Sequence, residues 1–454
     1  MFPVLLPTET INRELDSHLL LGAHLVQRGA HVFIGHQDAI HTAARYLRGG
    51  VLVGKSFEPT FPNVDLSWYE HVRARDVLCV HLDDEGAIFP GTEADWRTTL
   101  ARRLDVNRIA TDDIVCVWGR FQKSVYEAQK GPQLVRVTGH PRFDLYSKRW
   151  RSYFEPAAAR LRARHGDFLL LNTNLSTANH GLGIRYPFSP RARYDPAKPE
   201  SRHRALHFWA HTSRILVSFV ELIHRLSDAF PRLNIIVRPH PSENHDYYRI
   251  VTAGLRNVTV LHEGSVAPWI FASKAVIHDG CTTGVEAWLG GVPVINYKAL
   301  TDERYDQLLP NHFGARCTTQ DEVVATIERI LAGDPPAPGE VPALHRELMA
   351  NFEGDSLPLI LEVIELALKR VGPPGYRPSP HRIHAKVEAG LELARGLYRS
   401  ATPARRQMSK YSRQKFYGFG RDDVADRIRR LAATTSIRFR SELLSDQLLC
   451  LWPA

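Results

Sequence analysis

The first 145 residues of the chain alternate short apolar runs with amphipathic helical patterns. The runs that predict buried strands lie at residues 2–7, 31–35, 50–54, 77–83, 113–119 and 133–139. Between the first two runs, Leu15, Leu19 and Ala23 recur at helical spacing and predict a helix that ends before Gly29. Continuous apolar strands that alternate with helices are typical of a parallel sheet covered on both faces. We therefore expect a doubly wound sheet in this part of the chain.

The alternation of apolar runs and helical patterns begins again after a polar helical segment at 147–166. We interpret this segment as the connection between two domains. Further strands are predicted at 167–174, 234–241, 258–264, 275–280 and 292–297, and further helices within 205–230 and 320–332. Residues 187–203 contain four prolines and few apolar side chains, which predicts a long loop over the cleft. The predicted fold class is α/β, with two Rossmann-like, doubly wound parallel-sheet domains that face a cleft.

The predicted domains are an N-terminal domain at 1–150, a C-terminal domain at 151–372 and a basic helical extension at 373–454. Helical periodicity at 387–399 and 422–439 supports the last of these. The chain has 454 residues, which is enough for two to three domains of ~150 residues that each bury their own core. Its 44% hydrophobic and 24% charged residues are typical of folded globular proteins and exclude wholesale disorder.

The positive charge of the chain is concentrated near its C-terminal end. Residues 377–451 contain 16 Lys and Arg against 7 Asp and Glu, out of 58 and 49 in the whole chain, so the first 376 residues are balanced. That balance argues against a nucleic-acid groove across the body. The basic extension could contact an anionic membrane surface or an acidic partner, or it could simply be a solvated helical face.

The five cysteines are far apart and form no CxxC pair or paired metal spacing. This pattern predicts a reducing compartment and no zinc site. The N-terminal segment acquires acidic residues within its first sixteen positions, which disfavours a signal peptide, and no apolar run approaches the ~18–20 residues of a membrane span. We therefore expect a cytoplasmic protein.

Four polar clusters follow predicted strands, where the ligand-binding loops of a doubly wound sheet lie. The first is Asp83–Gly86, in which three consecutive carboxyl groups repel one another, so that one pKa could rise toward the range of a general base. An ordinary acidic loop is the alternative. The second is Arg238–Pro241, where two prolines stiffen the backbone around His240, so that His240 could donate to a phosphate oxygen or merely satisfy a nearby carbonyl.

The third cluster, His278–Glu286, is a strand end followed by a hydroxyl pair and a helix. Thr282 and Thr283 could join the helix amides in a phosphate cradle, with Glu286 one turn in to accept hydrogen bonds from a ribose diol, and an ordinary helix cap is compatible with that arrangement. The fourth cluster, Asn172–Asn174, is weak alone. The sequence contains no GxGxxG, GxxxxGK[ST], HExxH or GxSxG motif, so the enzyme classes that depend on them lose support.

The combination of these clusters resembles the signature of bacterial GT-B sialyltransferases. In that family an acidic pair before glycine, an HP motif and a hydroxyl pair occur in this order. More closely, a family of surface carbohydrate biosynthesis proteins related to capsule-type Kdo transferases is similar in the segments PTETINRELDSHLLLGAHLVQRGAHVFIG, VTGHPRFD, NTNLSTANH, VRPHPSEN and HDGCTTGVEAWLGGVPVINY. This resemblance covers roughly residues 1–370 and does not extend with comparable force to the basic extension.

The resemblance implies a GT-B-like fold and a glycosyltransferase that moves a CMP-activated keto sugar acid, of the Kdo or nonulosonate type, onto a surface-glycan precursor. By motif, His240 and the pair Thr282 and Thr283 would hold the donor phosphate. Glu286 and the loop that contains Asn172 and Asn174 would hold the nucleoside. Either Asp84 or Glu85 would be the acid/base group, and the three consecutive acids of this chain leave that choice open.

A CMP donor develops one dispersed negative charge when it is cleaved, which Arg238, His240 and helix amides could stabilise without a metal. We therefore expect no metal and no cofactor besides the CMP-sugar substrate. Arg13 is a candidate for the sugar carboxylate. Glu9 and Glu14 are candidates for acceptor contact or for a nucleophile, although Glu14 also fits an exposed acid in the first turn of a helix.

The second HP pair, His140–Pro141, is interpreted as a turn near the hinge, with Asp144 able to line the cleft. The partners implied are a nucleotide-sugar donor, a glycan or glycolipid acceptor, and an anionic membrane surface through 377–454, at the inner face of the cytoplasmic membrane. Three alternative hypotheses for the function are a CDP-glycerol-type polyol-phosphate transferase, a UDP-sugar epimerase and a non-catalytic scaffold in a glycan assembly complex.

Overall fold

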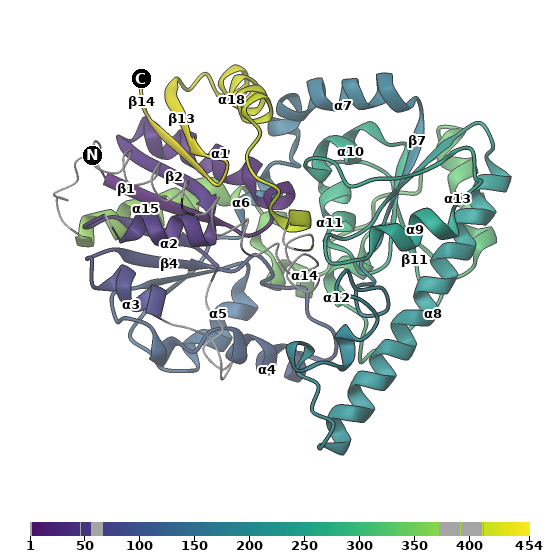
Figure 1. The fold of residues 1–454 in the computed structure, drawn as a ribbon, viewed down its shortest axis with the longest axis horizontal. Coiled ribbons are helices and arrows are strands. Elements are labelled where there is room, and N and C mark those ends of the chain that lie inside the picture. The colour runs from purple at the N-terminus through teal and green to yellow at the C-terminus, as the bar shows by residue number, and fades with distance from the viewer. Residues whose placement is uncertain (1, 46, 56–66, 372–390, 392–410, 412) are drawn as a thin grey trace.

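The structure is a computed structural model that describes residues 2–45, 47–55, 67–371, 391, 411 and 413–454. Two α/β domains lie side by side, each built around a sheet with helices on both faces (Figure 1). The predicted fold class, α/β with two doubly wound parallel-sheet domains, is confirmed.

The first domain contains an 8-stranded sheet whose parallel part follows the predicted apolar runs. Its parallel strands are β1 (Phe2–Thr8), β2 (Ala30–His36), β3 (Val51–Gly54), β4 (Leu78–Leu82), β5 (Ile114–Val117) and β6 (Leu134–Val137). The hairpin β13 (Phe439–Ser445) and β14 (Leu448–Pro453) completes it, in the order β13-β14-β2-β1-β3-β4-β5-β6. All of β4 and β5 is buried, as expected for strands covered on both faces.

The helices of the first domain cover the two faces of this sheet. They are α1 (Ile11–Gln27), α2 (Gln37–Ala44), α3 (Ser67–Arg73), α4 (Glu93–Arg103), η1 (Val106–Arg108), α5 (Arg120–Glu127) and α6 (Pro141–Asp144). Leu15, Leu19 and Ala23 of α1 are buried in the same apolar core as Val4 and Leu6 of β1, which confirms the periodicity expected there. The helices α2 to α5 contribute buried side chains to the opposite face.

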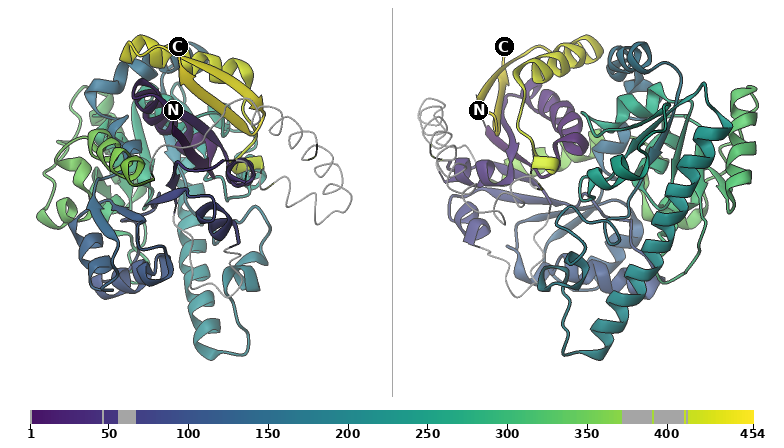
Figure 2. Two further views of the ribbon diagram at one scale, coloured as in Figure 1. Left: turned by 90° about the vertical axis from the view of Figure 1, so that its left-hand side faces the viewer. Right: turned by 45° about the vertical axis from the view of Figure 1, so that its right-hand side comes forward.

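The C-terminal extension is built into the first domain. Its helix α18 (Arg421–Thr435) agrees with the expected periodicity, but an entirely helical extension is wrong, because β13 and β14 form an antiparallel hairpin that pairs with β2 (Figure 2). The apolar run Leu448–Leu451 covers the edge of β2 and removes its unpaired backbone groups from solvent. The predicted helix at 387–399 lies outside the described residues, apart from Leu391.

The last helix before the extension crosses back to the first domain. The helix α15 (Ser356–Val371) packs against β3, β4 and β5, so residues 356–371 do not belong to the second domain and the boundary predicted at 372 does not match the packing. Asp144 accepts hydrogen bonds from the backbone N–H groups of Ser356 and Leu357 at 2.9 and 2.7 Å. Asp144 therefore caps the crossing helix at the hinge and does not line the cleft.

The second domain contains a 6-stranded, wholly parallel sheet in the order β12-β11-β10-β7-β8-β9. Its strands are β7 (Phe168–Asn172), β8 (Asn234–Arg238), β9 (Val258–Val260), β10 (Ala275–His278), β11 (Val294–Tyr297) and β12 (Ala315–Cys317). The short strand β12 is the one that the apolar pattern did not predict.

Helices cover both faces of the second sheet, and the long helix α8 extends beyond it (Figures 1 and 2). The helical segments of this part of the chain are η2 (Lys148–Trp150), α7 (Arg151–His165), η3 (Tyr186–Phe188), η4 (Pro190–Ala192), α8 (Pro199–Ala229), α9 (His245–Val251), α10 (Val266–Ala272), α11 (Thr282–Leu289), α12 (Leu308–His312), α13 (Gln320–Leu331), α14 (Ala343–Leu348) and η5 (Ala350–Phe352). Of these, α14 packs against α5 of the first domain. The segment predicted as a loop at 187–203 contains η4 and the first turn of α8, because Pro199 begins that helix at a position where proline is favoured.

An aromatic cluster joins the two domains. Tyr146 at the end of the first domain packs with Phe154 of α7 and Phe271 of α10, with ring centroids 5.7 to 6.5 Å apart. These rings belong to one apolar core that runs from the first sheet to the second. Within the described ranges, no helix is long and apolar enough to cross a bilayer.

The helix α18 is fixed to α1 by a buried ion pair. The Arg427 Nη1 and Asp16 Oδ1 atoms are 2.6 Å apart, both side chains are buried, and the Tyr153 hydroxyl donates to the same carboxylate. The guanidinium holds the pKa of Asp16 below its usual range despite the burial, which by itself raises it. The extension is therefore necessary for the charge balance of the first domain.

Replacing Arg427 with alanine is expected to lower the free energy of unfolding by about 3–5 kcal/mol, because Asp16 would keep an uncompensated buried charge. Chemical denaturation followed by circular dichroism measures this. The control Arg429→Ala, on the exposed side of α18, should change the free energy by less than about 0.5 kcal/mol. A loss below about 1 kcal/mol for Arg427→Ala would show that the ion pair is not needed.

Candidate active site

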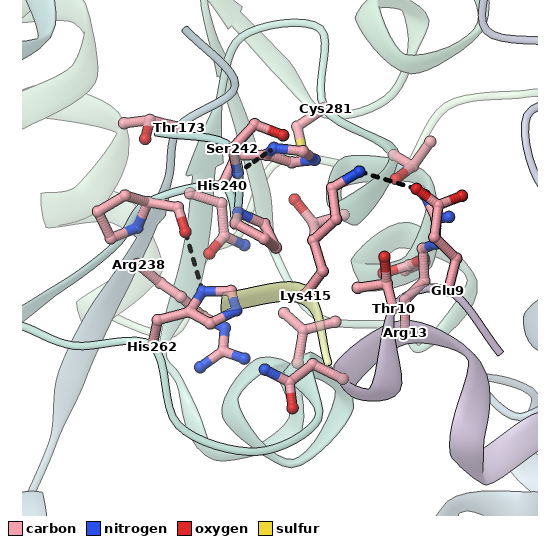
Figure 3. Close-up of a pocket in the computed structure, with 18 of the residues that line it drawn as sticks. Glu9, Thr10, Arg13, Thr173, Arg238, His240, Ser242, His262, Cys281 and Lys415 are labelled. Carbon is pink, nitrogen blue, oxygen red and sulfur yellow. Dashed lines mark hydrogen bonds and ion pairs between the residues drawn. The ribbon is translucent and has the colours of Figure 1, made fainter. Parts of the chain in front are cut away.

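A cavity of about 190 Å³ lies where the carboxyl ends of the two sheets face each other (Figure 3). Its walls come from the loops after β1, β4, β7, β8, β9 and β10 and from the C-terminal extension. The described lining residues are Glu9, Thr10, Asn12, Arg13, Glu85, Asn172, Thr173, Arg238, Pro239, His240, Pro241, Ser242, His262, Val266, Cys281, Thr282, Thr283, Glu286 and Lys415. Candidates from both halves of the sequence therefore share one cavity.

The loop after β1 places Glu9 and Arg13 on the first-domain wall. The Glu9 carboxylate lies between two amines, 3.2 Å from Lys55 Nζ and 2.8 Å from Lys415 Nζ. Although burial raises the pKa of Glu9, the two lysines lower it to about 2. Glu9 is therefore a carboxylate at neutral pH, and Lys415 reaches it from the extension (Figure 3).

Glu14 differs from both expectations for it, because it is neither exposed nor in the cavity. Its buried carboxyl group accepts the backbone N–H groups of Glu9 and Thr10 at 2.7 and 3.2 Å and contacts Arg13 at 2.9 Å. Burial and the nearby Asp84 carboxylate raise the pKa of Glu14 to about 7. Glu14 thus holds the β1–α1 loop in place, and a role as nucleophile is not supported by its position.

Asp84 and Glu85 follow β4 but face different surroundings. Asp84 is buried and contacts His140, with Oδ1 and Nε2 3.0 Å apart. Burial raises the pKa of Asp84 and the His140 contact lowers it, and the balance holds it well below its usual range. Glu85 lines the cavity, 3.6 Å from an Arg13 nitrogen, and Lys55 and Arg13 lower its pKa to about 2 against the effect of burial.

Steric crowding explains why a glycine, Gly86, follows the three acidic residues. A Cβ atom at Gly86 would lie 2.7 Å from the Trp118 ring, closer than side chains pack. The Trp118 indole N–H in turn donates to the Asp83 carbonyl at 2.6 Å. These contacts fix the turn that directs Glu85 into the cavity while Asp84 points to His140.

His240 stands at the end of β8 in a defined tautomer. The Ser242 backbone N–H donates to Nδ1 at 3.1 Å, so the proton of the neutral ring is on Nε2 (Figure 3). The His240 backbone N–H donates to Glu243 at 3.0 Å, which fixes the loop. Burial, together with the positive charges of Arg13 and Lys415, lowers the pKa of His240 to about 4. His240 is therefore a neutral hydrogen-bond donor in the cavity wall at neutral pH.

Arg238 lines the same cavity, but its guanidinium is already engaged. It donates to the carbonyl oxygens of Glu263 and Gly264 at 2.8 and 2.5 Å. Burial lowers its pKa to about 10, so it remains charged at neutral pH. Arg238 thus holds the loop after β9 and contributes positive charge beneath the cavity.

The helix α11 begins at the cavity and presents a hydroxyl pair. Thr282 and Thr283 both line it, and the buried Thr283 Oγ1 has no partner in hydrogen-bond geometry among the described residues. Gly284 follows because a Cβ atom there would lie 2.1 Å from His278 Nε2. The first two residues of α11 line the cavity, so the positive end of the helix dipole lies at its wall and favours negative charge.

Of the three residues predicted to contact the nucleoside, Asn172 and Glu286 line the cavity and Asn174 does not. Asn172 ends β7 and lines the cavity, and neither atom of its buried amide has a partner among the described residues. Asn174 does not line the cavity, and Thr173 takes its place. Glu286 lines it from α11, accepts the Tyr146 hydroxyl at 3.0 Å and lies 3.5 Å from Arg142. Burial raises the pKa of Glu286.

Sequence reasoning missed the contributions of Lys415, His140 and Arg142. Lys415 comes from the basic extension, where its position in the sequence gives no sign of contact with Glu9. His140 and Arg142 belong to the second HP pair, which was visible in the sequence but was interpreted as a turn. The turn is present, because the Arg142 backbone N–H donates to His140 Nδ1 at 3.2 Å. The Nε2–H of the same ring faces the Asp84 carboxylate at 3.0 Å, and burial lowers the pKa of His140, so it acts as a neutral hydrogen-bond donor to Asp84.

Among the described residues, no group of three or more His, Cys, Asp or Glu side chains is arranged to hold a metal ion. No family model matches the sequence, and no curated protein matches it.

Several solved structures are similar in overall fold. The UDP-GlcNAc 2-epimerase of Methanocaldococcus jannaschii is 11% identical, with 80% of this chain and 99% of that chain covered and a TM-score of 0.48. The wall teichoic acid polymerase TagF is 8% identical, with 81% and 89% covered and a TM-score of 0.47. A UDP-N-acetylglucosamine 2-epimerase of Rickettsia bellii is 10% identical, with 82% and 98% covered and a TM-score of 0.47.

The tautomer of His240 gives a direct test of the cavity geometry. Because its pKa is lowered to about 4, we expect the ring to stay neutral, with its proton on Nε2, from pH 8 down to about pH 5.5. Long-range proton–nitrogen NMR of the imidazole reads both the tautomer and the charge, and the signal is assigned by its loss in His240→Ala. Titration with a midpoint near the ordinary value of 6.5 would contradict the described environment.

Proposed function

We propose that the protein is a GT-B glycosyltransferase that transfers a CMP-activated keto sugar acid, of the Kdo or nonulosonate type, to a surface-glycan precursor. The observation that carries this proposal is that Glu85 of the first domain and His240 of the second line the same cavity. An acid/base group and a phosphate-binding group must meet in this way if a glycosyl bond is to form between the domains.

The second-domain wall supplies donors for a phosphate. His240 offers its Nε2–H, Thr282 and Thr283 offer hydroxyls, and α11 offers backbone N–H groups. None of these is a mobile charge, so they are organised before the reaction to stabilise the negative charge that develops on the leaving CMP. The charge of Arg238 beneath the cavity adds to this effect.

The nucleoside is assigned to the inner part of the same wall. The unpartnered amide of Asn172 can donate and accept, as recognition of a pyrimidine edge requires. Glu286 is assigned to the ribose hydroxyls, with Tyr146 and Arg142 fixing its orientation.

The first-domain wall is assigned to the sugar and the acceptor. Arg13 is the cation for the carboxylate of the donor sugar. Glu85 is the base that removes the proton of the acceptor hydroxyl, whereas Asp84 is committed to His140. The pKa of Glu85 is low because Arg13 and Lys55 are near, and an anionic sugar that neutralises Arg13 would raise it toward a more basic value. The cytoplasmic location and the membrane contact through 377–454 stay predictions from the sequence.

The donor class is tested by thermal shift with CMP, CDP, UMP and UDP, followed by turnover assays. We expect CMP to stabilise the protein most, and CMP to be released from a CMP-activated keto sugar acid. CMP release from CDP-glycerol alone would overturn the sugar donor and favour a polyol-phosphate transferase. Stabilisation by UDP alone would contradict a cytidylate leaving group.

Two variants separate the assigned roles. His240→Ala should lower kcat/KM for CMP release by about 10²-fold or more, because the leaving phosphate loses its donor. Glu85→Gln should lower transfer about 10²- to 10⁴-fold while CMP binding is kept. The control His224→Ala, on the exposed face of α8, should leave both unchanged. Wild-type turnover in His240→Ala with an intact fold would refute phosphate stabilisation by this side chain.

A further inference from the structure

A second and larger cavity, of about 590 Å³, opens beside the catalytic one. Ser242 and Lys415 line both cavities, so the two spaces adjoin at these residues. The second cavity is formed by the loop after β7, η3 and η4, the first turns of α8, the loops after β8 and β11 and the described residues of the extension, with Pro90 from the first domain. Of the elements proposed to hold the nucleotide, the loop after β7 contributes Ser176, Thr177 and His180, and the loop after β8 contributes Ser242.

The charge of this second cavity has one sign. Its described lining residues include four cationic side chains, Arg193, Arg204, Arg304 and Lys415, and no Asp or Glu. Arg304 contacts Asp302 and Lys415 contacts Glu9, and both of these acids lie outside the lining. The field inside the cavity therefore favours an anionic ligand.

Aromatic rings and hydroxyl groups form the rest of the wall. The His180 and Tyr186 rings stack with centroids 3.5 Å apart, and Tyr411 lies 5.3 Å from His180. Phe208, which is 38% exposed, packs against Tyr305 at 5.1 Å. Ser176, Thr177 and Ser201 add hydroxyl groups. Flat apolar faces next to hydroxyls and cations match the chemistry of a sugar chain, whose rings have C–H faces and polar edges.

We propose that this cavity is the acceptor subsite and that it binds a glycan carrying negative charge, as carboxylates or phosphodiesters. The proposal rests on the proposed function, because it takes the neighbouring cavity as the donor site. A glycan held by Arg204 and the aromatic wall would extend past Lys415 toward Glu9 and Glu85. Its terminal hydroxyl would then meet the base, while Arg204 and Tyr186 fix the more distant sugar units.

The test uses three oligosaccharide probes with the full chain. They are an α2,8-linked sialic acid hexamer, a glycerol-phosphate hexamer and neutral maltohexaose, each titrated by calorimetry. We expect at least one anionic probe to bind ten-fold or more tightly than maltohexaose, and the stronger of the two identifies the anionic group. Equal binding of all three, or binding of none, would overturn the proposal.

Matched variants locate the binding. Arg204→Gln and Tyr186→Ala should each weaken the anionic probe about ten-fold, as loss of one charge-assisted contact or one aromatic face predicts. The control Arg214→Gln lies on the same helix, exposed and outside the cavity, and should bind as wild type does. All three variants should keep the wild-type affinity for CMP. Unchanged probe binding in both cavity variants would place the glycan elsewhere.

The variant His240→Ala distinguishes failure of this proposal from failure of the proposed function. It should lose CMP release and still bind the anionic probe. If CMP release survives, the donor assignment fails. The titrations of Arg204→Gln and Tyr186→Ala with the anionic probe then test the second cavity independently. If probe binding disappears together with CMP binding in His240→Ala, the two cavities do not act as separate subsites.

Discussion

The active-site architecture depends on neutralising carboxylates that crowd the carboxyl ends of β1 and β4. Glu9, Asp84 and Glu85 all follow these two strands, and like charges at such short separation would drive the loops apart without nearby cations. Lys415 from the extension balances Glu9, and Arg13 and Lys55 lie near Glu85. Asp84 accepts a hydrogen bond from the neutral His140 at the end of the first domain. The C-terminal segment is therefore part of the first domain and of the cavity wall, and not an appendage.

The two domains contribute different kinds of polar groups to the cavity. The first domain presents carboxylates paired with cations, among them Glu9 with Lys55 and Lys415. The second domain presents a neutral His240, the Thr282–Thr283 pair and helix amides, which suit a phosphate without a strong local charge. The aromatic core around Phe154 and Phe271 holds these walls in register, so the cavity exists before a ligand binds.

The sequence predicted the sheets and the strand-end clusters well, because both depend on local patterns. Glu85 and His240 were identifiable since each follows an apolar run directly, and parallel strands end at one edge. Lys415 and His140 were not assigned, since their roles arise from contacts across 406 and 56 positions that no periodicity records. The hairpin at the C-terminal end was missed for the same reason. An isolated apolar run does not show which sheet edge it will pair with.

The most direct test of the central claim is a crystal structure of the protein soaked with CMP. The account predicts the phosphate between His240 Nε2 and the hydroxyl of Thr282 or Thr283, within hydrogen-bond distance of about 3 Å, with the ribose toward Glu286. A nucleotide bound outside this cavity, or inside it with its phosphate away from His240, would contradict the assignment of the donor site.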